Sequence, residues 1–283
     1  MLALVAAILI TSSLGELVLG RAAVDEALSP VIRTCLTLLA VLGAHVLMLR
    51  VVERRPWSDI GFGAEQARPR ALAWGALLGA VGVAVPVLLL LAASWLRVDT
   101  APPGGAASWL RAAAAVLALL APAALLEELI FRGYPFMVLR ESAGPVTALL
   151  LTGVIFGLVH AENPGASPGP LVIVALAGIF LGAVLLVTGS LWAAWTAHLA
   201  WNWVLAAVVH ASVSGLPFET PVYRVVDAGP DWLTGGPWGP EGGAGAAAGI
   251  LGALALLVAH RRRAHGGSFI NALIARPERR GGS

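Results

Sequence analysis

The sequence contains little charge. Only 12% of its 283 residues are Asp, Glu, Lys or Arg, whereas 58% are hydrophobic. A soluble domain of this length needs far more polar surface, so the composition excludes a soluble globular protein and indicates an integral membrane protein. The formal net charge of +2 is small, and it indicates neither nucleic acid nor an acidic substrate as a partner.

Lysine is absent, and cysteine is nearly absent. All 18 basic residues are arginine, and the single cysteine, Cys35, excludes an internal disulfide. Together with the many alanines and glycines, the use of arginine alone is typical of a GC-rich genome and favours a bacterial source.

Long apolar runs make up most of the sequence. A spanning helix needs about 20 mostly apolar residues, and eight stretches approach this length, at about residues 1–20, 31–52, 71–96, 108–130, 145–161, 169–188, 190–213 and 243–260. The sequence therefore predicts an all-α polytopic membrane helix bundle of about eight transmembrane helices over residues 1–265. A flexible cytoplasmic tail is predicted at 266–283. The alternative for the first stretch is a cleaved signal peptide, but it lacks a basic start and contains Glu16.

Arginine is unevenly distributed among the loops. The arginine-rich segments contain Arg50, Arg54, Arg55, Arg68 and Arg70 after the second stretch, Arg132 and Arg140 after the fourth, and Arg261, Arg262, Arg263, Arg276, Arg279 and Arg280 after the eighth. The loop at 162–168 has no arginine, and the loop at 214–242 has only Arg224. The positive-inside rule then predicts a multi-pass protein of the cell membrane with both termini in the cytoplasm.

Two loops have unusual compositions. Residues 53–70 mix aromatic with charged side chains, which is typical of a segment in the cytoplasmic interface; an ordinary polar loop is the alternative. Residues 214–242 are rich in Pro, Gly and aromatic residues, and we expect an ordered external cap or an interfacial loop.

Ionisable side chains within the apolar stretches are the first functional candidates, because each costs about 2.5–3.5 kcal/mol on insertion scales. They are Glu16, Arg33, His45, Glu127, Glu128, His160, His198 and His210, with Asn202 as a strong hydrogen-bonding amide. No motif surrounds His45 or His210, so we expect both to be structural or interfacial. Glu16 and Arg33 lie near the ends of their stretches, where side chains can extend to the interface.

The spacing of the remaining candidates places them on shared helix faces. Glu128 and Arg132 are four residues apart, so they can pair on one face, while Glu127 is rotated by about 100° and can face another neighbour. The same spacing separates Phe156 from His160, and His198 from Asn202. We expect a catalytic cavity between the fourth, fifth and seventh helices, near the cytoplasmic side of the membrane.

Two glutamates, two histidines and an asparagine are suited to hydrolysis. A carboxylate can take a proton from water while a histidine holds that water, and a second histidine with an amide can donate hydrogen bonds to a developing oxyanion. The alternative is that Glu127, His160 and His198 bind a divalent metal such as zinc, which would activate the water. The sequence contains no HExxH, so the usual two-histidine zinc signature is missing.

Three short motifs carry a family resemblance. EELIFR at 127–132, FGLVH at 156–160 and HLAWN at 198–202 resemble, in order, the EExxxR, FxxxH and HxxxN motifs of the CPBP family, the CAAX-processing and bacteriocin-processing intramembrane proteases, also called Abi. The sequence AENP after His160 also resembles the family. The resemblance covers about residues 115–210, which we term the CPBP-like core.

The resemblance implies an intramembrane endopeptidase of a family that is usually classed with the metalloproteases. Glu127 and His160 would activate water, and His198 and Asn202 would form the oxyanion hole. Glu128 would join the catalytic group and, with Arg132, orient the site from its edge, and Phe156 would pack beside it. The resemblance leaves open whether a metal or a glutamate activates the water.

The resemblance also implies a membrane-associated peptide or protein substrate within the lipid bilayer. Some members of the family cleave prenylated proteins, but a bacterial source favours another membrane-borne peptide. Trp195, Trp201 and Trp203 surround His198 and are candidates for a lipid-binding or peptide-binding groove, with an interfacial aromatic belt as the alternative. The sequence does not indicate an oligomeric state.

Two other functions remain open. The first is a non-proteolytic membrane scaffold or immunity protein on the same fold, which the complete motifs disfavour. The second is a proton-coupled transporter, in which buried acids and histidines form a relay. Transporters often contain two matching halves, and the sequence has no such internal symmetry.

Overall fold

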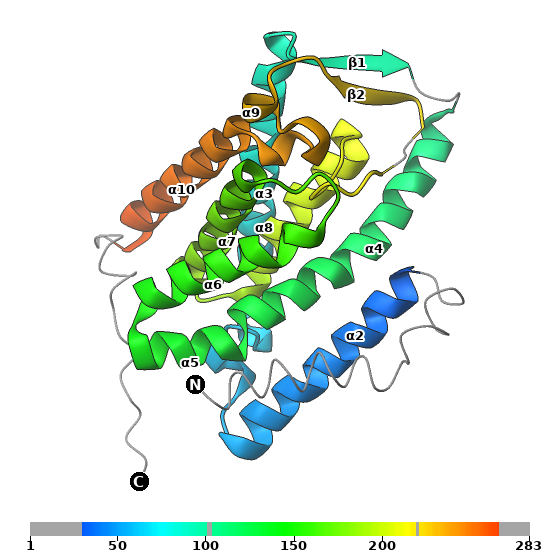
Figure 1. Cartoon of the computed structure of the whole chain (residues 1–283). Helices are drawn as coiled ribbons and strands as arrows, with labels where there is room; N and C mark the ends of the chain where they lie inside the picture. The colour runs from blue at the N-terminus through cyan, green and yellow to red at the C-terminus, as the bar shows by residue number, and fades with distance from the viewer. Residues whose placement is uncertain (1–29, 101–103, 219–220, 266–283) are drawn as a thin grey trace.

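The computed structural model describes residues 30–100, 104–218 and 221–265 (Figure 1). The longer helices are α2 (Pro30–His45), α3 (Pro69–Ala92), α4 (Ala106–Arg132), α5 (Tyr134–Ala143), α6 (Pro145–Val159), α7 (Pro168–Thr188), α8 (Leu191–Trp203) and α10 (Ala244–His265). The shorter elements are β1 (Leu96–Thr100), β2 (Tyr223–Asp227), α9 (Asp231–Thr234), the π-helical segments η1 (Val46–Val52) and η5 (Val204–Val209), and the 3₁₀ turns η2 (Trp57–Ile60), η3 (Ala64–Gln66), η4 (His160–Glu162), η6 (Gly236–Trp238) and η7 (Pro240–Gly242). The expected first span with Glu16 and the expected tail at 266–283 lie outside the described residues.

The described chain is a polytopic bundle of membrane-spanning helices, as predicted. By length and composition, the helices able to cross a membrane are Pro30–Val52, Pro69–Ala92, Ala106–Ala143, Pro145–Glu162, Pro168–Thr188 and Ala244–Arg262. The described residues thus contain six such helices rather than the seven predicted between residues 31 and 260. The stretch predicted at 190–213 does form a helix, α8 continued by η5, but polar residues such as His198 and Asn202 lower its hydropathy.

Small residues bring α8 against α3. Gly75 and Gly79 of α3 face Ala193 and Ala197 of α8, and a Cβ atom at Gly79 would collide with the carbonyl of Ala197. Helices in a bilayer associate closely where such residues meet, because their backbones can approach and gain van der Waals contact. α8 also packs against α4 and α7, so the residue that follows Ala197, His198, is held in the middle of the bundle.

The arginine-rich loops meet at one end of the bundle. Arg55 donates to both carboxylate oxygens of Glu141 on α5, at 2.9 and 2.7 Å, and this pairing raises the pKa of Arg55. The amide of Leu191, in the turn between α7 and α8, donates to the carbonyl of Gly61 at 2.9 Å. Helix α5, which is separated from α4 by Gly133 alone, was not predicted.

The arginine-poor loops meet at the other end. Here β1 pairs antiparallel with β2, from Leu96 opposite Asp227 to Thr100 opposite Tyr223, and this small sheet was not predicted. The segment at 214–242, apart from residues 219–220, contains β2, α9, η6 and η7, so its described residues are ordered; whether it is an external cap or an interfacial loop stays a prediction. We refer to this end as the sheet end and to the other as the arginine-rich end.

His45 and His210 are structural, as predicted. The ring of His45 donates from Nδ1 to the carbonyl of Val41 at 2.8 Å and accepts from the amide of Tyr134 at 3.2 Å, so it links α2 to the start of α5. The ring of His210 stacks on Tyr223 with 4.0 Å between centroids. Neither ring reaches the cavity described below.

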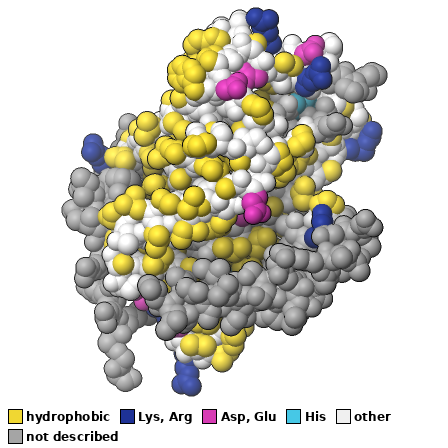
Figure 2. All heavy atoms as spheres, in the orientation of Figure 1, with side chains coloured by type: hydrophobic (Ala, Val, Ile, Leu, Met, Phe, Trp, Pro, Cys, Tyr) yellow, Lys and Arg dark blue, Asp and Glu magenta, His cyan; other side chains and the backbone are white. Residues whose placement is uncertain are grey.

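The surface has the pattern of a membrane protein. Figure 2 shows hydrophobic side chains over most of the described surface in that view, with arginines mainly at its margins. Leu88 and Leu89 of α3 and Leu251 of α10 are more than 60% exposed. Such exposure is stable where lipid covers the helices.

Candidate active site

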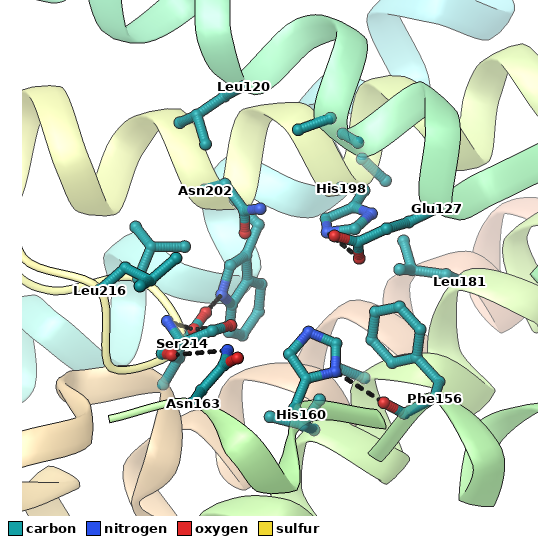
Figure 3. Close-up of a pocket in the computed structure, with 18 of the residues that line it drawn as sticks. Leu120, Glu127, Phe156, His160, Asn163, Leu181, His198, Asn202, Ser214 and Leu216 are labelled. Atoms are coloured by element: carbon teal, nitrogen blue, oxygen red, sulfur yellow. Dashed lines mark hydrogen bonds and ion pairs between the residues drawn. The ribbon is translucent and has the colours of Figure 1, made fainter. Parts of the chain in front are cut away.

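A cavity of about 320 Å³ lies inside the bundle. Its wall includes Glu127 of α4, Phe156 at the end of α6, His160 of η4, and His198 and Asn202 of α8 (Figure 3). The cavity predicted between the fourth, fifth and seventh helices is therefore present. Helix α7, the loop at 213–218 and η7 also contribute to its wall.

The two adjacent glutamates of α4 face different surroundings. Side chains at successive helical positions diverge by about 100°. Glu127 lines the cavity, and its side chain is 34% exposed. Glu128 points into the packed interior and is completely buried.

Glu128 is the centre of a buried polar network. Its Oε1 accepts from Nη1 of Arg132 at 3.2 Å and from Nδ1 of His198 at 2.9 Å. Nη2 of Arg132 donates to the carbonyl of Gly178 on α7 at 2.8 Å. The predicted pairing of Glu128 with Arg132 is confirmed, but both residues lie behind the cavity wall in the bundle interior and not at the edge of the site.

The ring of Phe156 packs between this network and the cavity. Its ring lies 4.4 Å from the guanidinium carbon of Arg132, within range of a cation–π contact. Ring centroids are separated by 4.9 Å between Phe156 and His160 and by 5.9 Å between Phe156 and His198. The expected packing of Phe156 beside the site is confirmed.

Hydrogen bonding fixes which histidine nitrogens face the cavity. A backbone carbonyl can only accept, so the 2.7 Å bond from His160 to the carbonyl of Phe156 places a proton on Nδ1 of His160. Its Nε2 points into the cavity (Figure 3). Likewise, Nδ1 of His198 is engaged by Glu128, and its Nε2 lies 3.8 Å from Oε2 of Glu127.

A metal centre is not assembled in this geometry. In the described parts of the chain, no group of three His, Cys, Asp or Glu side chains is placed to hold a metal ion. The sequence-based hypothesis that Glu127, His160 and His198 bind a divalent metal therefore stays a prediction.

Three residues that the sequence analysis did not select also line the cavity: Asn163, Ser214 and Glu241. Nδ2 of Asn163 donates to the carbonyl of Ser214 at 2.9 Å. Oε1 of Glu241 accepts from the amide and, at 2.9 Å, from the hydroxyl of Ser214. Its Oε2 accepts from the indole of Trp201 at 2.8 Å. AENP could have indicated Asn163, but Glu241 lies in a polar loop without a motif.

Of the three tryptophans near His198, only Trp201 lines the cavity. The indoles of Trp195 and Trp203 instead donate to the carbonyls of Ala121 and Ala113 at 2.9 and 3.0 Å, so they anchor α8 to α4. A groove formed by all three tryptophans is therefore not present.

The cavity extends toward the sheet end. Glu127 lies more than a turn before the end of α4, and the far wall is formed by Asn163, by Ser214 to Phe218 and by Glu241. This differs from the expectation of a site near the arginine-rich end. Helix α6 has only 15 residues, and His160 of η4 and Asn163, which follow its end, both line the cavity.

Glu127, His160, His198 and Asn202 thus line one interior cavity of a membrane helix bundle. Residues 108–204 match the family model described as Rce1-like, the type II CAAX prenyl endopeptidases. This match confirms the CPBP resemblance and, at the level of the family, indicates a membrane endopeptidase. No curated protein and no solved structure matches the chain. Ser214 and Glu241 lie beyond the matched segment.

Proposed function

We propose that this protein is an intramembrane endopeptidase that cleaves a peptide bond of a membrane-associated protein or peptide. Glu127 is the observation that carries the proposal. Two carboxylates line the cavity, and both oxygens of Glu241 already accept hydrogen bonds. The Glu127 side chain is 34% exposed at the cavity wall, and its buried Oε2 has no hydrogen-bond partner among the described residues, so we assign this carboxylate as the base that deprotonates a water.

Activation of water is the first step of the proposed reaction. Glu127 takes a proton from a water in the cavity, while Nε2 of His160 accepts the other hydrogen of that water as a hydrogen bond. The water oxygen, now hydroxide-like, bonds to the carbonyl carbon of the substrate. A positioned base of this kind contributes about 10²–10⁴-fold to a rate.

Stabilisation of the oxyanion is assigned to α8. The carbonyl oxygen that becomes negative accepts from Nδ2 of Asn202 and from Nε2 of His198. His198 can donate from Nε2 only as an imidazolium, because its Nδ1 proton already bonds Glu128 at 2.9 Å. The charge of Glu128 at that distance stabilises the imidazolium, and the low polarity of the cavity strengthens each contact.

Collapse of the intermediate completes the reaction. The carbon–nitrogen bond breaks, and the leaving nitrogen takes the proton held by Glu127. The products are a carboxylic acid and an amine, and Glu127 returns to its carboxylate form. Glu128 and Arg132 touch neither substrate nor water, so we assign them as positioning residues for His198.

The substrate is proposed from the family match and the cavity wall. The matched family consists of prenyl CAAX endopeptidases, and apolar side chains such as Leu120, Leu181 and Phe218 line most of the cavity. We propose an apolar, membrane-embedded substrate segment, with prenylation as a property to be tested. We also propose that the arginine-rich end faces the cytoplasm.

Peptide cleavage by the purified protein tests the proposal. Wild type and Glu127→Gln are compared on membrane-anchored peptides with and without a prenyl group, each with and without a metal chelator. Glu162→Gln is the matched control, because Glu162 is exposed and is not part of the cavity wall. We expect loss of at least about 10²-fold in Glu127→Gln, wild-type cleavage by Glu162→Gln, and no effect of the chelator.

Each other outcome argues for a different conclusion. Equal cleavage by Glu127→Gln and wild type would refute the role of Glu127. Loss of wild-type activity with chelator, restored by added metal, would refute the metal-independent reaction. Absence of cleavage by a folded wild type on every peptide would favour a scaffold, and proton-driven transport in liposomes would favour a transporter.

A further inference from the structure

A second depression lies at the arginine-rich end, outside the candidate active site. It has a volume of about 580 Å³ and lies between the start of α3, the end of α7 and the end of α10. Its polar wall is formed by Arg68, Arg70, Trp74, His260 and Arg261. We call this depression the arginine groove.

The arginine groove has positive charge without a matching carboxylate. No Asp or Glu belongs to its wall, and within the described chain Arg68, Arg70 and Arg261 take part in no salt bridge. Arg68 and Arg261 donate only to backbone carbonyls, those of Glu65 at 3.0 Å and Val187 at 3.4 Å. Elsewhere Arg55, Arg132 and Arg224 each have an acidic partner.

The groove also contains hydrogen-bond donors without acceptors. Nε1 of Trp74 and Nε of Arg261 are buried and have no partner in the described residues. The Trp74 ring instead lies against His260, with 4.4 Å between ring centroids. Buried donors are normally satisfied, so an acceptor from outside the protein would complete this wall.

Apolar side chains continue the groove along the bundle. Leu77, one turn beyond Trp74 on α3, and Val187 of α7 belong to the same wall, and Leu77 is 47% exposed. Arginines at the end of a spanning helix lie at the depth of the lipid headgroups, and the residues beyond them lie at the depth of the acyl chains. The groove therefore presents donors where a phosphate lies and apolar surface where a lipid chain lies.

We propose that the arginine groove binds an anionic phospholipid, with its phosphate between Arg68, Arg70 and Arg261 and an acyl chain along Leu77. Basic pockets between transmembrane helices bind anionic headgroups in this manner. Planar guanidinium groups suit a phosphate because they donate two parallel hydrogen bonds. This binding is independent of the proposed peptidase reaction.

Native mass spectrometry of the delipidated full-length protein in detergent tests the proposal. The protein is titrated with phosphatidylglycerol or with phosphatidylcholine. The variant R68Q/R70Q/R261Q is compared with R50Q/R54Q/R97Q, which removes three exposed arginines outside the groove. We expect roughly five-fold weaker phosphatidylglycerol binding for each groove arginine removed, about 100-fold in total, and less than about two-fold in the control.

Two further variants separate charge from packing. R68K/R70K/R261K keeps the charges but removes the paired guanidinium donors, so it is expected to recover only part of the affinity. Trp74→Phe keeps an aromatic ring beside His260 and removes the indole donor. We expect it to lose less phosphatidylglycerol affinity than the triple glutamine variant does. If the triple glutamine variant does not elute as a folded species, Arg261→Gln alone is titrated in the same way, with a loss of about five-fold expected.

Three results would overturn the proposal. The first is equal binding of phosphatidylcholine and phosphatidylglycerol. The second is an equal loss of affinity in the groove variant and in the control variant. The third is complete displacement of the lipid by excess inorganic phosphate, which would assign the groove to free phosphate and not to a lipid.

Discussion

The adjacent glutamates of α4 should differ in how the same substitution affects stability. Glu127→Gln and Glu128→Gln each replace one carboxylate oxygen by an amide nitrogen and keep the side-chain volume. Glu127 is partly exposed at the cavity wall, whereas Glu128 is completely buried in contact with Arg132 and His198. We expect Glu127→Gln to abolish cleavage without loss of stability, and Glu128→Gln to reduce both.

The loss of stability in Glu128→Gln follows from the charge that remains behind. Arg132 is fully buried, and without Glu128 it keeps uncharged partners: the carbonyl of Gly178 at 2.8 Å and the rings of Phe156 at 4.4 Å and Phe131 at 5.7 Å. Breaking a buried ion pair on one side costs about 3–5 kcal/mol. The glutamine oxygen can still accept one hydrogen bond, so we expect a loss of about 3 kcal/mol.

Glu127→Gln should change stability little. No described residue donates a hydrogen bond to Oε2 of Glu127. The substitution removes the 3.8 Å ion pair with Nε2 of His198, but the Glu127 side chain is 34% exposed, and such exposed pairs contribute about 0–1 kcal/mol. No buried hydrogen bond is broken. Substitutions away from such interactions usually stay within about 0.5 kcal/mol. Cleavage should nevertheless fall by at least about 10²-fold, because an amide cannot take the proton from water.

Two measurements on the same preparations test this division of roles between Glu127 and Glu128. The free energy of unfolding is measured by SDS titration in mixed micelles, and cleavage is measured on the best peptide substrate. The double variant Glu128→Gln with Arg132→Gln should cost less than the sum of its single variants, because the pair acts as a unit. Equal destabilisation by Glu127→Gln and Glu128→Gln would refute the division of roles between the two glutamates.

Three further substitutions test the surroundings of the site. Gly178→Ala places a Cβ atom 2.9 Å from Cα of Gly153 and 3.2 Å from Nη2 of Arg132. Its free energy of unfolding should therefore fall by about 1–3 kcal/mol. Gly169→Ala is the control, because Gly169 has open space around it, and its free energy of unfolding should change little. Glu241→Gln replaces the carboxylate that accepts hydrogen bonds from Trp201 and Ser214. We expect faster hydrogen exchange at 213–216 and a raised KM. Unchanged exchange would show that Glu241 does not hold this loop against α8. Glu141→Gln weakens a partly exposed pair with Arg55, and because such pairs contribute about 0–1 kcal/mol, a larger loss of stability would show that this contact holds the arginine-rich end together.

The spanning helices were predictable because the bilayer sets their length. The stretches predicted at 71–96 and 169–188 correspond to Pro69–Ala92 and Pro168–Thr188. The pairing of Glu128 with Arg132 was also predictable, because spacing by four residues places two side chains on one helix face. Both inferences use information within a single helix.

Helix α5 and the small sheet were not predictable by the same means. Arg140 and Glu141 interrupt the apolar pattern of α5, so the segment resembled a loop. In the fold, Glu141 pairs with Arg55 from a distant segment, a contact that the pattern within one segment does not indicate. The strands β1 and β2 are more than 100 residues apart in sequence. Their pairing depends on the bundle bringing both loops to the same end.

Glu241 shows most clearly why the sequence reveals only part of the site. An acid within an apolar stretch attracts attention because its burial is costly, but Glu241 lies between Pro240 and Gly242 in a loop where an acid is ordinary. Its burial, with 7% of its area exposed, arises because the loop folds back onto Trp201, 40 residues away. Trp201 directly precedes Asn202, so Glu241 links this loop to the helix that carries the proposed oxyanion hole. The segment beyond the matched residues 108–204 therefore completes the cavity, and activity should depend on contacts that none of the three motifs contains.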